Sequence, residues 1–262
     1  MGKGRRRDWW NRPEVERMSK VKIDKKQIKK AATYKVISID ELHGEEAKSS
    51  IPKTIYRFLD DEGYAKDFVN GQILVTTLEC CRNYKNAARG DKNEGREVYH
   101  LDQYVTGNSY DSWFQSAIAN TGIVVGEGCY GVTVGDIRST NYLSDAYVLP
   151  TTIGFSDDSL VSDFGEHCVE IFDVAGFAHA LNLAMREQLN TPSGLVGQVT
   201  YASQLYRYGE SRPGVIGFVK EPKGYEDQEE FRFLWESSNA KIDRVVVNVP
   251  DASRFCRLRP AG

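Results

Sequence analysis

The segment Gly224-Tyr-Glu-Asp-Gln-Glu-Glu-Phe-Arg-Phe-Leu-Trp235 decides how this sequence is interpreted. A carboxylate-rich start is followed by alternating apolar residues, which predicts a turn that leads into a β-strand. With the strand period of two, Gln228, Glu230 and Arg232 share one face, and the two phenylalanines share the other. The pattern predicts an amide, a carboxylate and a guanidinium in a row, either as the polar side of an edge strand or as part of a site.

The composition is that of a globular protein that can bury a sizeable core. Of 262 residues, 40% are hydrophobic and 27% are charged, enough for one large domain or two small ones. No apolar run approaches the roughly 18 residues of a membrane span, and the N-terminus lacks the apolar centre of a signal peptide. We therefore expect a cytoplasmic protein that does not bind membranes. The five cysteines form no CxxC pair and the four histidines do not cluster, so neither disulfides nor a metal site is expected.

The charge is distributed unevenly along the chain. Residues 1–30 hold 12 Lys/Arg against 4 Asp/Glu, a net charge of +8, whereas the remaining residues carry −11. Trp9 and Trp10 follow the first arginine run, and cations with aromatic rings suit a nucleic-acid backbone and unstacked bases. The same composition is also typical of a tail that binds a protein partner, or of a passive tail without a binding role. We predict a basic arm at 1–32 and a single domain at 33–262.

Local patterns predict an α+β fold with mixed, largely antiparallel sheets and a few helices. Helices are expected at 62–70 and from about Gly176 to Leu189, the second capped by Asp173. The second helix carries one apolar stripe, which is expected to face the core: Phe177, Leu181, Ala184, Met185 and Leu189. A mixed-charge segment at 89–95 is typical of an exposed loop, and 98–149 is predicted to be a β-rich elaboration. Strands are expected at 33–39, 53–58, 72–78 and 147–156, and in several segments between 197 and 249.

The sequence offers no familiar catalytic motif in its usual context. A GxGxxG string occurs at 126–131, but the short β-branched runs between glycines around it predict strands or hairpins and not a strand that leads into a helix, so classical dinucleotide-fold chemistry has no support. The sequence contains no GxxxxGK[ST] loop, so P-loop chemistry has no support either. No Ser-His-Asp or Cys-His set is recognisable. A metal-dependent nuclease using Asp157, Asp158 and Glu166 is a weaker alternative, because these residues lack a known ligand spacing.

Three short segments carry a resemblance to a known family. They are Tyr56-Arg57, the hydroxyl-rich stretch Thr151 to Ser156, and Gln228-Glu229-Glu230. Together they resemble the ADP-ribosyltransferase fold, in the subgroup that combines an arginine, a Ser/Thr-rich strand and a Gln/Glu-x-Glu motif. Four further segments are similar to a group of bacterial and prophage proteins: Asp67–Gly71, Arg89–Gly95, Phe164–Gly165 and Tyr225–Arg232. Some relatives of this kind are toxins of phage-defence toxin–antitoxin systems that attach ADP-ribose to RNA.

The resemblance implies NAD as a substrate and a role for each matching residue. Arg57, with Tyr56 beside it, would bind the pyrophosphate. Glu230 would stabilise positive charge at the anomeric carbon as nicotinamide leaves, and Gln228 would orient the acceptor. The hydroxyls that would contact NAD are those of Ser156, Thr152 and Thr151, with Thr76 and Thr77 second; none reproduces the family's Ser-Thr-Ser.

The implied function is NAD-dependent mono-ADP-ribosyl transfer to a macromolecule, with RNA the expected acceptor and an antitoxin the expected protein partner. The rival hypothesis is a non-enzymatic nucleic-acid-binding or assembly module that uses the basic arm. In that case Arg57 and Glu230 would be structural. Arg232 either belongs to the site or forms a structural ion pair with Glu230 or a neighbour, and the ion pair is the preferred prediction.

Overall fold

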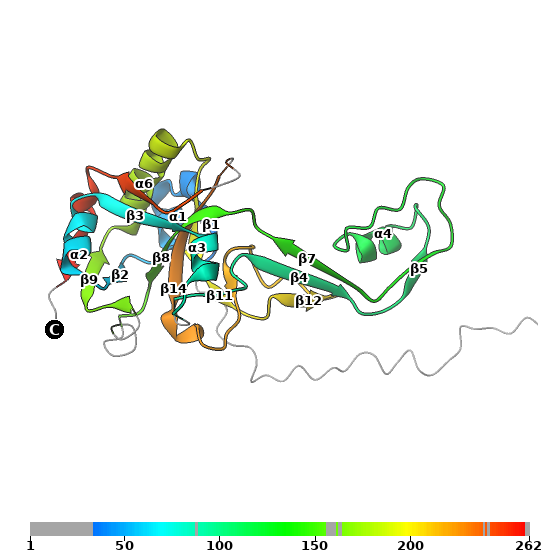
Figure 1. Ribbon diagram of the computed structural model, residues 1–262. Coiled ribbons are helices and arrows are strands. Elements are labelled where there is room, and N and C mark those ends of the chain that lie inside the picture. The colour runs from blue at the N-terminus through cyan, green and yellow to red at the C-terminus, as the bar shows by residue number, and fades with distance from the viewer. Residues whose placement is uncertain are drawn as a thin grey trace, which may run out of the picture. The chain divides into compact units, whose positions relative to one another are not determined.

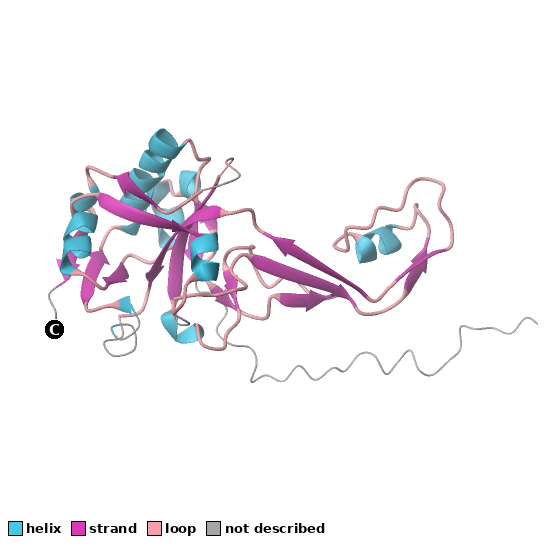
Figure 2. Cartoon of the chain, in the orientation of Figure 1, coloured by secondary structure: helices cyan, strands magenta, loops and turns pink. Residues whose placement is uncertain are grey.

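A computed structural model describes residues 34–86, 89–155, 161, 164–237, 239 and 242–259. The predicted basic arm at 1–32 lies outside the described residues, as do Ser156, Asp157 and Asp158. The described residues all belong to one compact unit. Within it, most strand pairs are antiparallel and the helices are few (Figure 2), which confirms the predicted α+β class with largely antiparallel sheets.

The largest sheet has nine strands, and all of its pairings are antiparallel. Figure 1 shows β14 beside β8 at its centre. Seven strands follow in the order β1 (Ile37–Ser38), β10 (Leu195–Gln198), β14 (Glu230–Glu236), β8 (Ala146–Thr152), β2 (Ile55–Leu59), β9 (His167–Ile171) and β16 (Cys256–Arg259). Off this path, β3 (Gln72–Thr77) pairs with β8 and with β15 (Val245–Asn248).

The sheet divides at β8, and this division creates the space for a site. One end of β8 pairs with β2 through Thr152 and Tyr56, whereas the other end pairs with β3 through Val148 and Thr76. Strand β2 meanwhile pairs along its whole length with β9. Strands β2 and β8 therefore diverge beyond a single shared register position.

The main core lies between this sheet and α6 (Val174–Leu189), which carries the apolar stripe predicted for this helix. The Asp173 side chain accepts a hydrogen bond from Gly176 N and caps the helix as expected. Phe177 is buried and packs edge-on against Phe233 of β14, with ring centroids 5.7 Å apart. The other helical segments are α1 (Gly44–Ser49), α2 (Glu62–Val69), α3 (Leu78–Asn83) and α4 (Ser112–Ile118), with short 3-10 turns η3 (Ile39–Glu41), η4 (Glu226–Gln228) and η5 (Ala252–Arg254).

A second, smaller core belongs to the segment predicted as a β-rich elaboration. It packs α4 against two small sheets and contains Tyr99, Phe114 and Ile118. The sheets are β12 (Leu205–Arg207), β4 (Arg96–Leu101) and β7 (Ile137–Tyr142), and the pair β5 (Val105–Gly107) and β6 (Val132–Val134). The structure narrows the predicted range of 98–149, because β8 begins at Ala146 and is central to the main sheet.

Two further features complete the fold. A parallel pair, β11 (Thr200–Tyr201) and β13 (Val219–Lys220), lies close to the start of β14, because Val199 N bonds to Glu230 O. Within the described part of the chain, none of the helices has both the length and the apolar character that a bilayer crossing requires.

Candidate active site

A cavity opens where β2 and β8 diverge, with an empty volume of about 600 Å³ that is partly open to solvent. It brings together the three sequence segments that the resemblance singled out: Tyr56-Arg57, Thr151-Thr152, and Gln228 with Glu230. The remaining lining residues are Phe58, Cys81, Arg89, Glu94, Val148, Pro150, Phe164, Lys220 and Arg232. Residues from four strands, from helix α3, from the turn η4 and from the segments around Glu94 and Phe164 therefore surround one space.

The start of β14 differs from the prediction. The sequence predicted that Gln228 and Glu230 alternate on one strand, but Gln228 ends the 3-10 turn η4 and the strand begins at Glu230. Between them, Glu229 adopts a left-handed backbone with φ of 42°, so the period of two does not apply. Gln228 and Glu230 both line the cavity because of this turn, not because of strand alternation.

The two threonines of β8 fasten this turn to the sheet. Thr151 Oγ1 donates to Phe231 O at 2.5 Å, and Thr152 Oγ1 donates to Gln228 O at 2.7 Å. Both hydroxyls thus hold the backbone around Glu230 in place. Thr76 and Thr77, the second-ranked pair, do not line the cavity; the Thr77 hydroxyl instead accepts from Cys80 N as the cap of α3.

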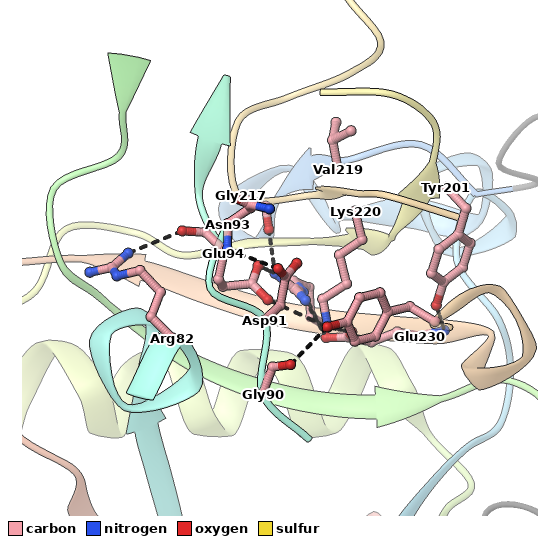
Figure 3. A network of polar contacts seen from close by, with 12 residues as sticks. Arg82, Gly90, Asp91, Asn93, Glu94, Tyr201, Gly217, Val219, Lys220 and Glu230 are labelled. Carbon is pink, nitrogen blue, oxygen red and sulfur yellow. Dashed lines mark hydrogen bonds and ion pairs between the residues drawn. The ribbon is translucent and has the colours of Figure 1, made fainter. Parts of the chain in front are cut away.

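The inner wall of the cavity is a buried charge cluster, defined here as Glu94, Lys220, Glu230 and Arg232, each at most 7% exposed. Glu230 Oε2 lies 2.7 Å from Lys220 Nζ, and Glu230 Oε1 lies 2.7 Å from Arg232 Nε. Glu94 bridges the same two cations, at 2.6 Å from Arg232 Nη1 and 3.4 Å from Lys220 Nζ. Figure 3 shows Lys220 and Glu94 directed toward Glu230. The predicted ion pair of Arg232 is confirmed.

The balance of two cations and two carboxylates keeps the cluster ionised. Burial by itself would raise the pKa of Glu230, but the charges of Arg232 and Lys220 outweigh burial and lower that pKa to about 2. Burial would likewise lower the pKa of Lys220, but Glu230 and Glu94 outweigh burial and raise it above its ordinary value. Glu230 is therefore a carboxylate at neutral pH, held in one orientation by donors on both of its oxygens.

Sequence reasoning missed two of these four residues. The segment 89–95 was predicted to be an exposed loop, but Glu94 is 1% exposed and Asp91 is 5% exposed. The mixed charge of this loop did not predict burial, because its partner cations lie more than a hundred residues away in sequence. Lys220 ends the apolar run Val215–Val219, and a lysine in that position is the only local signal.

A second layer of residues surrounds Lys220. The Tyr225 ring lies 5.3 Å from Lys220 Nζ, and its hydroxyl donates to Gly90 O at 2.8 Å. Tyr201 OH accepts from Glu230 N at 2.9 Å. Among the described residues, Asp91 Oδ2 has no hydrogen-bond partner, and burial raises the pKa of Asp91. These contacts restrict the loop and the strands that carry the cluster.

A second group of lining residues, called the rim here, consists of Tyr56, Arg57, Phe58 and Phe164, of which Phe58 is buried. Arg57 Nη1 donates to Pro150 O at 2.7 Å, across the gap between β2 and β8. Burial lowers the pKa of Arg57, but a guanidinium keeps its charge at neutral pH. Within the described ranges, Arg57 forms no ion pair with a carboxylate. The rim therefore offers three aromatic rings and one cation to a ligand.

Comparison with known proteins gives no relative for this chain. No protein-family model, curated protein or solved structure matches it. The roles of the cavity residues therefore rest on their geometry and chemistry.

Proposed function

We propose that this protein is an NAD-dependent mono-ADP-ribosyltransferase with an ADP-ribosyltransferase-like fold, and that the cavity between β2 and β8 is its active site. One observation carries the proposal: Arg57, Gln228 and Glu230 line a single cavity although their segments are about 170 residues apart in sequence. Ordinary structural ion pairs would not require an open cavity next to them.

The rim suits the chemistry of a dinucleotide. NAD combines two phosphates with flat rings, and a guanidinium makes charge-assisted hydrogen bonds to phosphate oxygens. Within the described ranges Arg57 forms no ion pair, so no carboxylate of the protein competes with a phosphate for its guanidinium. The rings of Tyr56, Phe58 and Phe164 supply stacking surfaces for a base or for nicotinamide.

The charge cluster suits the bond-breaking step. When the bond between the ribose anomeric carbon and the nicotinamide nitrogen breaks, its electron pair leaves with nicotinamide and the ribose becomes positively charged. A fixed, ionised Glu230 would stabilise this charge without reorganising. Gln228 would orient the acceptor, whose lone pair then forms the new bond to the anomeric carbon while a proton passes to solvent.

The acceptor that the lining favours is an anionic macromolecule, and we propose RNA. Of the four cations in the lining, Lys220 and Arg232 pair with Glu94 and Glu230, and Arg89 pairs with Asp60. Arg57 is the cation of the lining that forms no ion pair within the described ranges, and an unbalanced cation attracts a polyanion. The roles as a cytoplasmic toxin in phage defence, and as the target of an antitoxin, belong to the same proposal and derive from the sequence resemblance.

A non-enzymatic nucleic-acid-binding or assembly module is the second candidate, and one observation favours it. Both oxygens of Glu230 already accept hydrogen bonds from buried cations. A buried carboxylate with both oxygens bonded is also compatible with a purely structural role. If Glu230 is catalytic, replacing it should reduce ADP-ribosyl transfer more than replacing Glu94 in the same cluster. If Glu230 is structural, the two replacements should have similar effects.

The experiment is label transfer from adenylate-labelled NAD to total RNA, DNA and protein of a bacterial lysate. The wild-type chain is compared with Glu230→Gln and with Glu94→Gln, a matched control that removes one carboxylate from the same cluster. We expect label in one fraction, with transfer lost about a hundredfold or more in Glu230→Gln because the carboxylate that stabilises positive charge in the transition state is gone. Glu94→Gln should retain clearly more activity.

Both variants are also unfolded in urea, so that lost activity can be compared with lost stability. If the two variants lose transfer in equal proportion, Glu230 acts through the fold and the catalytic assignment fails. If the wild-type chain neither labels any fraction nor releases nicotinamide, the non-enzymatic candidate replaces the enzymatic one.

A further inference from the structure

The last described residue of β16, Arg259, lies across the sheet from the rim. Arg259 pairs in register with Cys168 of β9, and Cys168 pairs in turn with Phe58 of β2. Residues that oppose one another in a sheet project to the same face. Arg259 therefore shares a face with Phe58, a lining residue of the cavity.

The Arg259 guanidinium and the rim rings form one continuous group. Its carbon lies 3.6 Å from the centre of the Phe155 ring and 5.5 Å from the centre of the Tyr56 ring. Phe155 in turn lies 5.2 Å from Tyr56 and 5.8 Å from Phe58, between ring centres. Because Tyr56 and Phe58 line the cavity, this group extends the cavity wall outward along the sheet.

Arg259 differs from the two nearby arginines because no carboxylate among the described residues pairs with it. Arg257 pairs with Glu170 at 2.9 Å, and Arg254 pairs with Asp251 at 3.7 Å. Arg259 forms no ion pair within the part of the chain that the structure describes. The Phe155 ring beneath it is 36% exposed, so part of the ring is open to a ligand.

A partly exposed guanidinium held over an aromatic ring matches one ligand chemistry closely. Nucleobases stack on aromatic rings and on guanidinium planes, and the same guanidinium can donate to an adjacent phosphate. Phe155 and Arg259 thus offer a stacking surface and a hydrogen-bond donor to phosphate together.

We propose that Tyr56, Phe155 and Arg259 form a nucleotide-binding subsite beside the cavity. The nucleotide has two possible sources with the same chemistry: the adenylate half of NAD, or one nucleotide of a single-stranded RNA acceptor. The proposed subsite depends on the proposed function in one respect, which is that the neighbouring cavity binds NAD. A nucleotide can bind to the subsite whether or not the protein catalyses a reaction.

The test is direct binding to the full-length chain, measured by calorimetry with 5′-AMP and by fluorescence anisotropy with a short labelled single-stranded RNA. Arg259→Gln is compared with the matched control Arg254→Gln, which removes the same charge from an arginine 70% exposed and over the Phe255 ring. We expect Arg259→Gln to weaken one ligand about tenfold. Arg254→Gln should change neither ligand by more than about twofold, as expected for an exposed paired arginine.

The two sources give different results, and both support the subsite. Weaker 5′-AMP binding assigns it to the donor, whereas weaker RNA binding, with the salt slope reduced by about one, assigns it to the acceptor. Phe155→Leu is the second variant and should weaken the same ligand as Arg259→Gln. If neither ligand binds, or if Arg259→Gln, with wild-type urea unfolding, binds both as the wild type does, the subsite is overturned. Ligand binding without nicotinamide release would refute the proposed function and leave the subsite standing.

Discussion

The charge cluster and the rim face each other across one cavity, but they use their cations in opposite ways. In the cluster, Lys220 and Arg232 each contact two carboxylates, so the charges are balanced within the protein. On the rim, Arg57 donates to a carbonyl, and within the described ranges neither Arg57 nor the adjoining Arg259 forms an ion pair. The cluster therefore holds a fixed geometry without a ligand, whereas the rim has charge left for one.

The largest expected effect comes from Arg232→Met, which removes the cation between Glu94 and Glu230. Two buried carboxylates then share Lys220 alone, and breaking a buried ion pair by removing one partner costs about 3–5 kcal/mol. We expect the free energy of unfolding in urea at pH 7 to fall by that amount. A loss under about 1 kcal/mol would mean that the cluster does not stabilise the fold.

Acid should weaken the cluster by a similar mechanism, with a smaller effect. The pKa of Glu230 is about 2 in the folded chain against an ordinary value of 4.5. The carboxylate thus contributes stability that is fully present above pH 4.5 and is lost as pH falls toward 2. The loss is on the order of 1 kcal/mol for each pH unit between these two values. Urea unfolding at several pH values between 7 and 3 measures it, and Glu230→Gln should flatten this dependence.

The smallest effect on stability is expected at the rim. Arg57→Gln removes one hydrogen bond from a charged donor to Pro150 O, worth about 1.5–3 kcal/mol at most. If Arg57 binds phosphate, the same variant should raise the KM for NAD about tenfold, with a smaller change in kcat. Steady-state nicotinamide release gives both constants. A stability loss as large as that of Arg232→Met would remove the contrast between rim and cluster.

Local patterns were sufficient for the elements but not for every detail of the site. The capping by Asp173, the stripe of α6 and the strand that ends at Trp235 follow from nearest neighbours in sequence, and all are present. The prediction that Gln228 and Glu230 lie on one strand face was wrong, because Gln228 belongs to a 3-10 turn and the strand begins only at Glu230. The left-handed Glu229 that joins turn and strand has no marker in the sequence, since it is not a glycine.

Periodicity along the chain was enough to predict the α+β class. The grouping of Arg57, Thr151, Thr152, Gln228 and Glu230 came from the resemblance of short motifs to a known family, and the cavity brings these residues together. Neither source could show that Glu94 and Lys220 enclose Glu230, or that Arg259 lies over Phe155. The physical reason is that burial and charge balance depend on which distant strands become neighbours. That choice is set by the division of the sheet at β8, and no local window of the chain contains it.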